Sequence, residues 1–67
     1  MTQCEQIINH IQEHGSITPL EAMDNYGIMR LASRICDLQK QGYKIKRETV
    51  EDHNRFGEVV RYTRYFL

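Results

Sequence analysis

The 67-residue sequence lacks the features that mark an enzyme or a membrane protein. No hydrophobic run is long enough to cross a bilayer, and neither a Gly-rich phosphate loop nor a set of nucleophile, base and acid residues is present. A chain this short also leaves little room for a deep substrate cleft. We therefore expect a protein that is not an enzyme, needs no cofactor and folds as a single domain over residues 1–67.

Cysteine is scarce, since Cys4 and Cys36 are the only two and they lack the spacing of a CxxC motif. Polar residues follow Met1 directly, so we expect no signal peptide and a cytoplasmic location. In that compartment both thiols are expected to be reduced and partly buried. His10 and His14 have the spacing of two metal ligands on a helix, but no third ligand has credible spacing, so no metal site is expected.

Basic residues are absent from residues 1–29, which contain four acidic residues. Residues 30–67 contain all nine Lys and Arg residues and five acidic ones, a net charge of +4, although the whole chain is neutral. This polarity gives the chain one cationic part that could meet nucleic-acid phosphates. A mixed, solvated surface is the alternative explanation.

Capping signals and apolar periodicity predict two helices in the first part of the chain. The first covers Thr2–His14 and starts with a Thr-x-x-Glu capping box before a glycine ends it. Between the helices Ile17 stands among polar residues and predicts a short extended segment. The second helix begins at Thr18-Pro19, again with a capping box, and ends by Tyr26. The expected inner residues of the two helices are Cys4, Ile7, Ile8, Ile11, Leu20, Ala22 and Met23.

A third helix is predicted between Gly27 and Gly42, directly after a turn that contains the first of these glycines. A short helix, a turn and a second helix form a helix-turn-helix unit. The apolar positions recur at helical spacing, so one side of the third helix is expected to face the core. These positions are Ile28, Leu31, Ala32, Ile35 and Leu38.

After Gly42 the apolar period changes from helical to alternating, which predicts a β-hairpin. The expected strands cover residues 43–50 and 58–67, and a polar loop over residues 51–57 joins them. We expect Tyr43, Tyr62 and Phe66 to pack the hairpin against the helices. Phe56 is the exception, because it lies at the tip of the loop and is expected to be exposed.

The order of these elements resembles the small winged helix-turn-helix domains of phages, prophages and other bacterial mobile elements. Two segments carry the resemblance, GSITPLEAMDNYGIMRLASRICDLQKQGYKI at residues 15–45 and GEVVRYTRYFL at residues 57–67. The resemblance covers most of the chain and implies an α+β fold with three helices and a C-terminal β-hairpin wing. It also implies DNA binding, in the role of a transcriptional regulator or a recombination accessory factor.

In a helix-turn-helix unit, the N-terminal part of the second helix faces base edges in the major groove. Arg30, Ser33 and Arg34 are therefore the expected base-reading residues, since arginine can hold guanine with two hydrogen bonds. The alternatives are an ion pair of Arg34 with Asp37 or of Arg30 with an acidic residue of the second helix. Other basic residues are candidates for phosphate contacts, with cross-strand ion pairs as the alternative for those on the strands. They are Lys44, Lys46, Arg47, Arg55 and Arg61.

A reading surface this small gives few contacts with double-stranded DNA, so we expect a homodimer or a second protein bound alongside. The acidic first helix is a candidate surface for that contact. A second functional hypothesis is a protein-binding module, such as a phage-type inhibitor, because the chain is neutral overall and the predicted loop is acidic. Basic side chains gathered on one surface favour DNA, whereas basic side chains paired with acids favour a protein partner.

Overall fold

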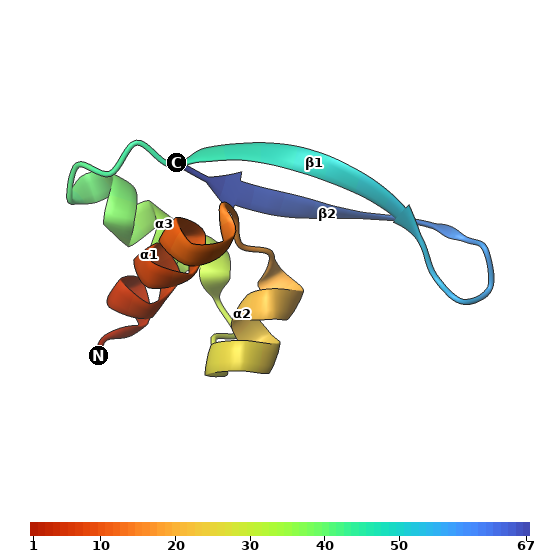
Figure 1. Ribbon diagram of the computed structural model, residues 1–67. Coiled ribbons are helices and arrows are strands. Elements are labelled where there is room, and N and C mark those ends of the chain that lie inside the picture. The colour runs from red at the N-terminus through yellow and green to blue at the C-terminus, as the bar shows by residue number, and fades with distance from the viewer.

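The computed structural model describes residues 1–67 and contains three helices followed by a two-stranded antiparallel hairpin (Figure 1). The elements are α1 (Gln3–His14), α2 (Pro19–Tyr26), α3 (Leu31–Lys40), β1 (Lys46–His53) and β2 (Val59–Phe66). This confirms the predicted order of three helices and a C-terminal hairpin. None of the three helices has the length and apolar character needed to cross a membrane.

Local signals in the sequence set the ends of α1 and α2. Thr2 and Thr18 each accept a hydrogen bond from the backbone N–H three residues later, and the glutamate at that position accepts one from the threonine N–H in return. Both predicted capping boxes are therefore confirmed. Gly15 and Gly27 end the helices with positive φ angles of 89° and 66°, a conformation that glycine adopts without a steric penalty.

The core lies where α1, α2, α3 and the start of the hairpin meet. Ile17 forms the predicted extended segment, because it exchanges two backbone hydrogen bonds with Tyr65 of β2. This bridge draws the connection between α1 and α2 onto the hairpin. The core residues are Ile7, Ile8, Ile11, Ile17, Ala22, Ile28, Leu31, Ile35, Leu38, Ile45 and Tyr65.

Three predicted inner residues are instead exposed: Leu20, Met23 and Ala32. The helix α2 has only eight residues, and Ala22 alone among them is buried, so its inner side is too narrow for the two larger side chains. In α3 the buried positions are Leu31, Ile35 and Leu38, which follow a narrow stripe that leaves Ala32 outside.

The hairpin, which we define as Lys46–Phe66, is offset from the prediction: β1 starts and ends three residues later than expected, and β2 is one residue shorter at each end. Its register pairs Lys46 with Phe66 and His53 with Val59, so residues 51–53 belong to β1 and the loop is shorter than expected. The hairpin extends well beyond the helices, and the molecule measures 39 × 21 × 21 Å (Figure 1). The distal part therefore pairs only with itself.

The side chain that packs the hairpin against the helices is Tyr65, which is 8% exposed. The sequence predicted Tyr43, Tyr62 and Phe66 for this role, and the prediction is wrong for the first two, which are exposed, while Phe66 is only half-buried. Successive residues of a strand point to opposite faces, so the burial of Tyr65 turns Tyr62 away from the core. Phe56 is 80% exposed at the tip, as predicted.

Candidate nucleic-acid interface

The connection between α2 and α3 is a tight turn that is held by the end of α2. The N–H of Gly27 donates to the carbonyl of Met23, and the N–H of Ile28 donates to the carbonyl of Ala22. Ile28 is buried, so the turn is attached to the core although it lies outside both helices. The two helices are thus fixed relative to each other by backbone bonds and by one apolar anchor.

The helix α3 begins later than the sequence predicted. Arg30 has φ −119° and ψ 62°, which is not helical, and it occupies the N-cap position without capping the helix through its side chain. Helical residues therefore start at Leu31 rather than just after Gly27. Arg30 lies one turn before Arg34, whose N–H donates to the Arg30 carbonyl, so the two residues remain neighbours.

The side of α3 that faces away from the core is largely uncharged at its centre. Because Leu31, Ile35 and Leu38 are buried, the opposite side of the helix contains Ser33, Cys36 and Lys40, with Ala32 beside them. Of these four exposed residues only Ser33 was among the predicted base-reading residues. Helical spacing from the buried residues would have placed Cys36 and Lys40 on this side, whereas the sequence assigned Ala32 to the core side.

Arg30 and Arg34 lie together on one flank of this outward side. They line an open depression of about 320 Å³ with Gln3, Gly27 and Met29. Arg34 is half-buried, and its Nη2 lies 3.2 Å from Oδ2 of Asp37, which is the ion pair that the sequence left open as an alternative. Arg30 is exposed and has no acidic partner within 4.0 Å.

The basic residues of the hairpin fall into two groups. Arg61 Nε lies 2.8 Å from Glu51 Oε1, and Arg64 pairs with Glu48. These two arginines therefore form the cross-strand ion pairs that were the alternative to phosphate contacts. Lys46 and Arg47 at the start of β1 are exposed and form no ion pair, and the same holds for Lys44 just before the strand.

The distal hairpin, residues 51–60, has a different character from the base. Arg55 is its only Lys or Arg residue, and it stands among Glu51, Asp52 and Glu58. With Phe56 this makes the tip acidic and apolar. The structure therefore separates Arg55 from the predicted contacts on α3, because the tip lies at the end of the hairpin that is far from the helices (Figure 1).

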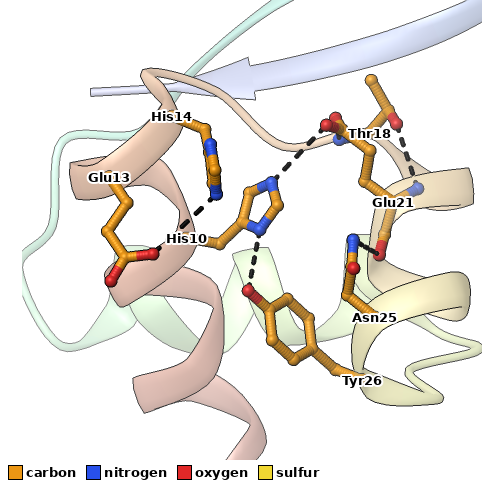
Figure 2. A network of polar contacts seen from close by, with 7 residues as sticks. All are labelled: His10, Glu13, His14, Thr18, Glu21, Asn25 and Tyr26. Atoms are coloured by element: carbon orange, nitrogen blue, oxygen red, sulfur yellow. Dashed lines mark hydrogen bonds and ion pairs between the residues drawn. The ribbon is translucent and has the colours of Figure 1, made fainter.

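A buried histidine that the sequence did not single out as a core residue connects α1 to α2. Figure 2 shows His10 between Tyr26 and Glu21, with its Nδ1 2.7 Å from the Tyr26 hydroxyl and its Nε2 3.5 Å from Oε2 of Glu21. The other carboxylate oxygen of Glu21 caps α2 by accepting from the Thr18 N–H. His14 lies beside the His10 ring, with 4.5 Å between the ring centroids.

In this arrangement Nδ1 of His10 is hydrogen-bonded to Tyr26, whereas the buried Nε2 makes no hydrogen bond and lies 3.5 Å from the Glu21 carboxylate. No group of three or more His, Cys, Asp or Glu side chains lies close enough together to hold a metal ion. His10 therefore acts as a structural link between α1 and the helix-turn-helix unit.

Comparison with known proteins gives one result. A family model described as a winged helix-turn-helix domain matches residues 2–67, which includes all three helices and the hairpin. Searches of curated proteins and of solved structures find no match.

Proposed function

The chain belongs to the winged helix-turn-helix domain family, and on this premise we propose that it binds double-stranded DNA sequence-specifically with α3 in the major groove. The observation that carries this proposal is the outward side of α3, which presents short side chains between Arg30 and Arg34 on one flank and Lys40 near its end. Short side chains let a helix approach base edges closely, and the flanking cations supply hydrogen-bond donors.

We assign base contacts to Arg30, Ser33 and Arg34. Arg30 is free of acidic partners and is the strongest of the three. To contact a base, Arg34 must break its ion pair with Asp37. The cost is small, because an ion pair that is exposed to this extent contributes little stability.

We assign phosphate contacts to Lys44, Lys46 and Arg47, where the hairpin leaves the body of the molecule. Charge supports this choice, because residues 27–45 contain four basic residues and one acidic residue, whereas the distal hairpin is acidic. Arg55 contributes less among its acidic neighbours, and Glu51 already holds Arg61.

The biological role we propose is that of a small transcriptional regulator or a recombination accessory factor of a phage, prophage or similar mobile element. The support is the resemblance of residues 15–45 and 57–67 to such proteins, together with the match of the winged helix-turn-helix family model over residues 2–67.

The test is selection of binding sites from a pool of random duplex DNA at two salt concentrations. Wild-type binding should weaken as salt rises, because phosphate contacts release counterions. The double variant Arg30→Ala/Arg34→Ala should lose roughly 1–3 kcal/mol of binding free energy for each base contact removed. Circular dichroism and thermal unfolding establish that the variant is folded.

A matched control is Arg61→Ala/Arg64→Ala, which also removes two arginines but takes them from cross-strand ion pairs. This control should bind far better than the α3 variant. Equal losses in the two variants would show that charge alone, rather than α3, determines binding. A folded wild-type protein that binds no DNA at low salt would refute the proposal.

That last outcome would favour the second candidate function, a protein-binding module. The specific observation on its side is the acidic and apolar tip, with exposed Phe56 beside Glu58. Affinity capture with wild type and with Phe56→Ser would then test the tip as the contact surface.

A further inference from the structure

The outer edge of β1 is an unpaired strand edge. The sheet contains only β1 and β2, and it is β2 that packs against α2 and forms the bridge with Ile17 (Figure 1). An exposed edge of eight residues presents backbone donors and acceptors that can pair with another strand. A two-stranded hairpin in water is also marginally stable without further support.

The backbone bonds show which residues of β1 point their polar groups outward. Tyr65 is the β2 partner of Arg47, and both the N–H and the C=O of Tyr65 bond to Ile17 on the other side. The pair of Arg47 and Tyr65 is therefore a non-hydrogen-bonded pair. Because such pairs alternate along an antiparallel ladder, the residues that direct their N–H and C=O groups to the free edge are Arg47, Thr49, Glu51 and His53.

The charges along β1 are self-complementary in the antiparallel direction. The strand reads KRETVEDH, so it starts with two basic residues and has two acidic residues near its end. If a second copy pairs through the same edge with Thr49 opposite Thr49, Lys46 lies opposite Asp52 of the second copy and Arg47 lies opposite its Glu51. Two-fold symmetry repeats both pairs, which gives four opposite-charge pairs.

Neighbouring registers lose this match. Moving the centre to Glu48 places two Glu48 side chains opposite each other, and moving it to Val50 places Glu48 opposite Asp52 twice. Like charges directly opposite each other destabilise a strand pair. The Thr49-centred register also matches three pairs of outward-pointing residues, which would form about six backbone hydrogen bonds.

From this geometry we infer that the protein forms a homodimer through β1, with a four-stranded antiparallel sheet in the order β2–β1–β1–β2 centred on Thr49. The inference goes beyond DNA binding and does not require it. In the dimer Lys46 and Arg47 pair with acids of the second copy, so the dimer and phosphate compete for these two side chains.

The first test measures association of the full chain without DNA, by sedimentation equilibrium in low salt. Lys46→Glu and Asp52→Lys each turn two attractive pairs into repulsive ones, so each variant alone should dimerise about tenfold more weakly or worse. An equimolar mixture of the two variants restores opposite charges at every position and should recover dimers. Neither residue forms an ion pair within its own chain.

The second test identifies the register by disulfide cross-linking in a Cys4→Ser/Cys36→Ser background. Thr49→Cys should cross-link rapidly on oxidation, because the two residues are expected at about 5.5 Å between Cα atoms, within disulfide reach. Glu48→Cys is the matched control, since each thiol introduced there would lie opposite Val50 of the second copy and too far from the equivalent thiol to form a disulfide.

A monomeric wild-type protein at high concentration would overturn the inference, and so would a mixture of charge variants that fails to associate. Faster cross-linking at position 48 than at position 49 would exclude this register. Circular dichroism shows whether each variant is folded. None of these measurements uses DNA, so failure here and failure of DNA binding are distinguishable.

Discussion

At the scale of single residues, His10 determines how α1 is joined to α2. It is 3% exposed, and its two ring nitrogens meet side chains from opposite ends of α2, Glu21 in the first turn and Tyr26 in the last (Figure 2). Burial of a polar group is costly unless the group is paired. The hydrogen bond from one end of α2 and the 3.5 Å contact with the Glu21 carboxylate at the other thus hold that helix in position along α1.

Tyr26→Phe should destabilise the fold by about 1–3 kcal/mol, because it leaves the buried Nδ1 of His10 without its 2.7 Å partner. Urea unfolding monitored by circular dichroism measures the change. Tyr43→Phe is the matched control, since the exposed Tyr43 makes no side-chain hydrogen bond and its change should be within about 0.5 kcal/mol of zero. Equal effects of the two substitutions would contradict a structural role for the His10 contact.

The buried position of His10 could be predicted from the sequence, but its structural role could not. His10 is three residues after Ile7 and adjacent to Ile11, so helical spacing already places it on the buried side. Because histidine is polar, His10 was not counted among the predicted core residues. Its spacing from His14 pointed only to two metal ligands without a third. The partners that explain its burial come from α2 and could not be inferred from α1 alone.

At the scale of secondary-structure elements, the two Thr-x-x-Glu capping boxes fix the start of α1 and α2. In the first of them, the hydrogen bond from the Thr2 backbone, and then that from its side chain, lower the pKa of Glu5 below its ordinary value of 4.5. A lowered pKa in the folded state means that the ionised carboxylate stabilises the fold. This contribution is present above the unfolded-state pKa and disappears as the pH falls through the folded-state pKa.

Glu5→Gln should therefore lower the thermal stability at neutral pH and make it less sensitive to acid. Between pH 6 and pH 3, the melting temperature of the variant should fall less than that of wild type, because one shifted carboxyl has been removed. Thermal unfolding across this pH range measures both slopes. Glu13→Gln is a control without a capping role, and it should keep the wild-type pH dependence.

Helices were easier to predict than strands for a physical reason. Threonine caps, Pro19 and the two terminal glycines act locally, so the ends of α1 and α2 follow from a few neighbouring residues. The end of β1 depends on pairing with β2 across the loop, and its last residues contact nothing but solvent and that partner. Their polar side chains made them resemble a loop.

At the scale of the whole molecule, the structure divides into a packed body and a projecting hairpin. The bridge of Ile17 with Tyr65 and the contacts of α2 with β2 join the two, and the distal hairpin is supported only by its own cross-strand bonds and by exposed ion pairs. Exposed ion pairs contribute little, so the distal hairpin has the lowest local stability.

Amide hydrogen exchange should show this division in dilute solution. The amides of residues 51–60 should exchange much faster than those of buried positions in α1 and α3, and the amides of Ile17 and Tyr65 should be protected. Two-dimensional NMR gives these rates residue by residue. Uniform protection along the hairpin would contradict the division and would indicate that another chain covers it.

The candidate interface could be predicted only in part. Charge asymmetry and helical spacing located the basic region around Arg30 and Arg34, and they are properties of the sequence alone. Which arginines are held by acids depends on the strand register, and the sequence could not show that Arg61 meets Glu51. The central residues of the outward side of α3, such as Cys36, were missed because their side chains are small and uncharged.

The bridge between Ile17 and Tyr65 also affects the order of events during synthesis of the chain. Contacts between distant positions close a large loop, and its entropic cost must be met before the contacts form. The buried Tyr65 belongs to the core, so the helices cannot complete their packing until that residue has left the ribosome. Folding of the helical body is therefore delayed until β2 has been made, although the sequences of all three helices emerge much earlier.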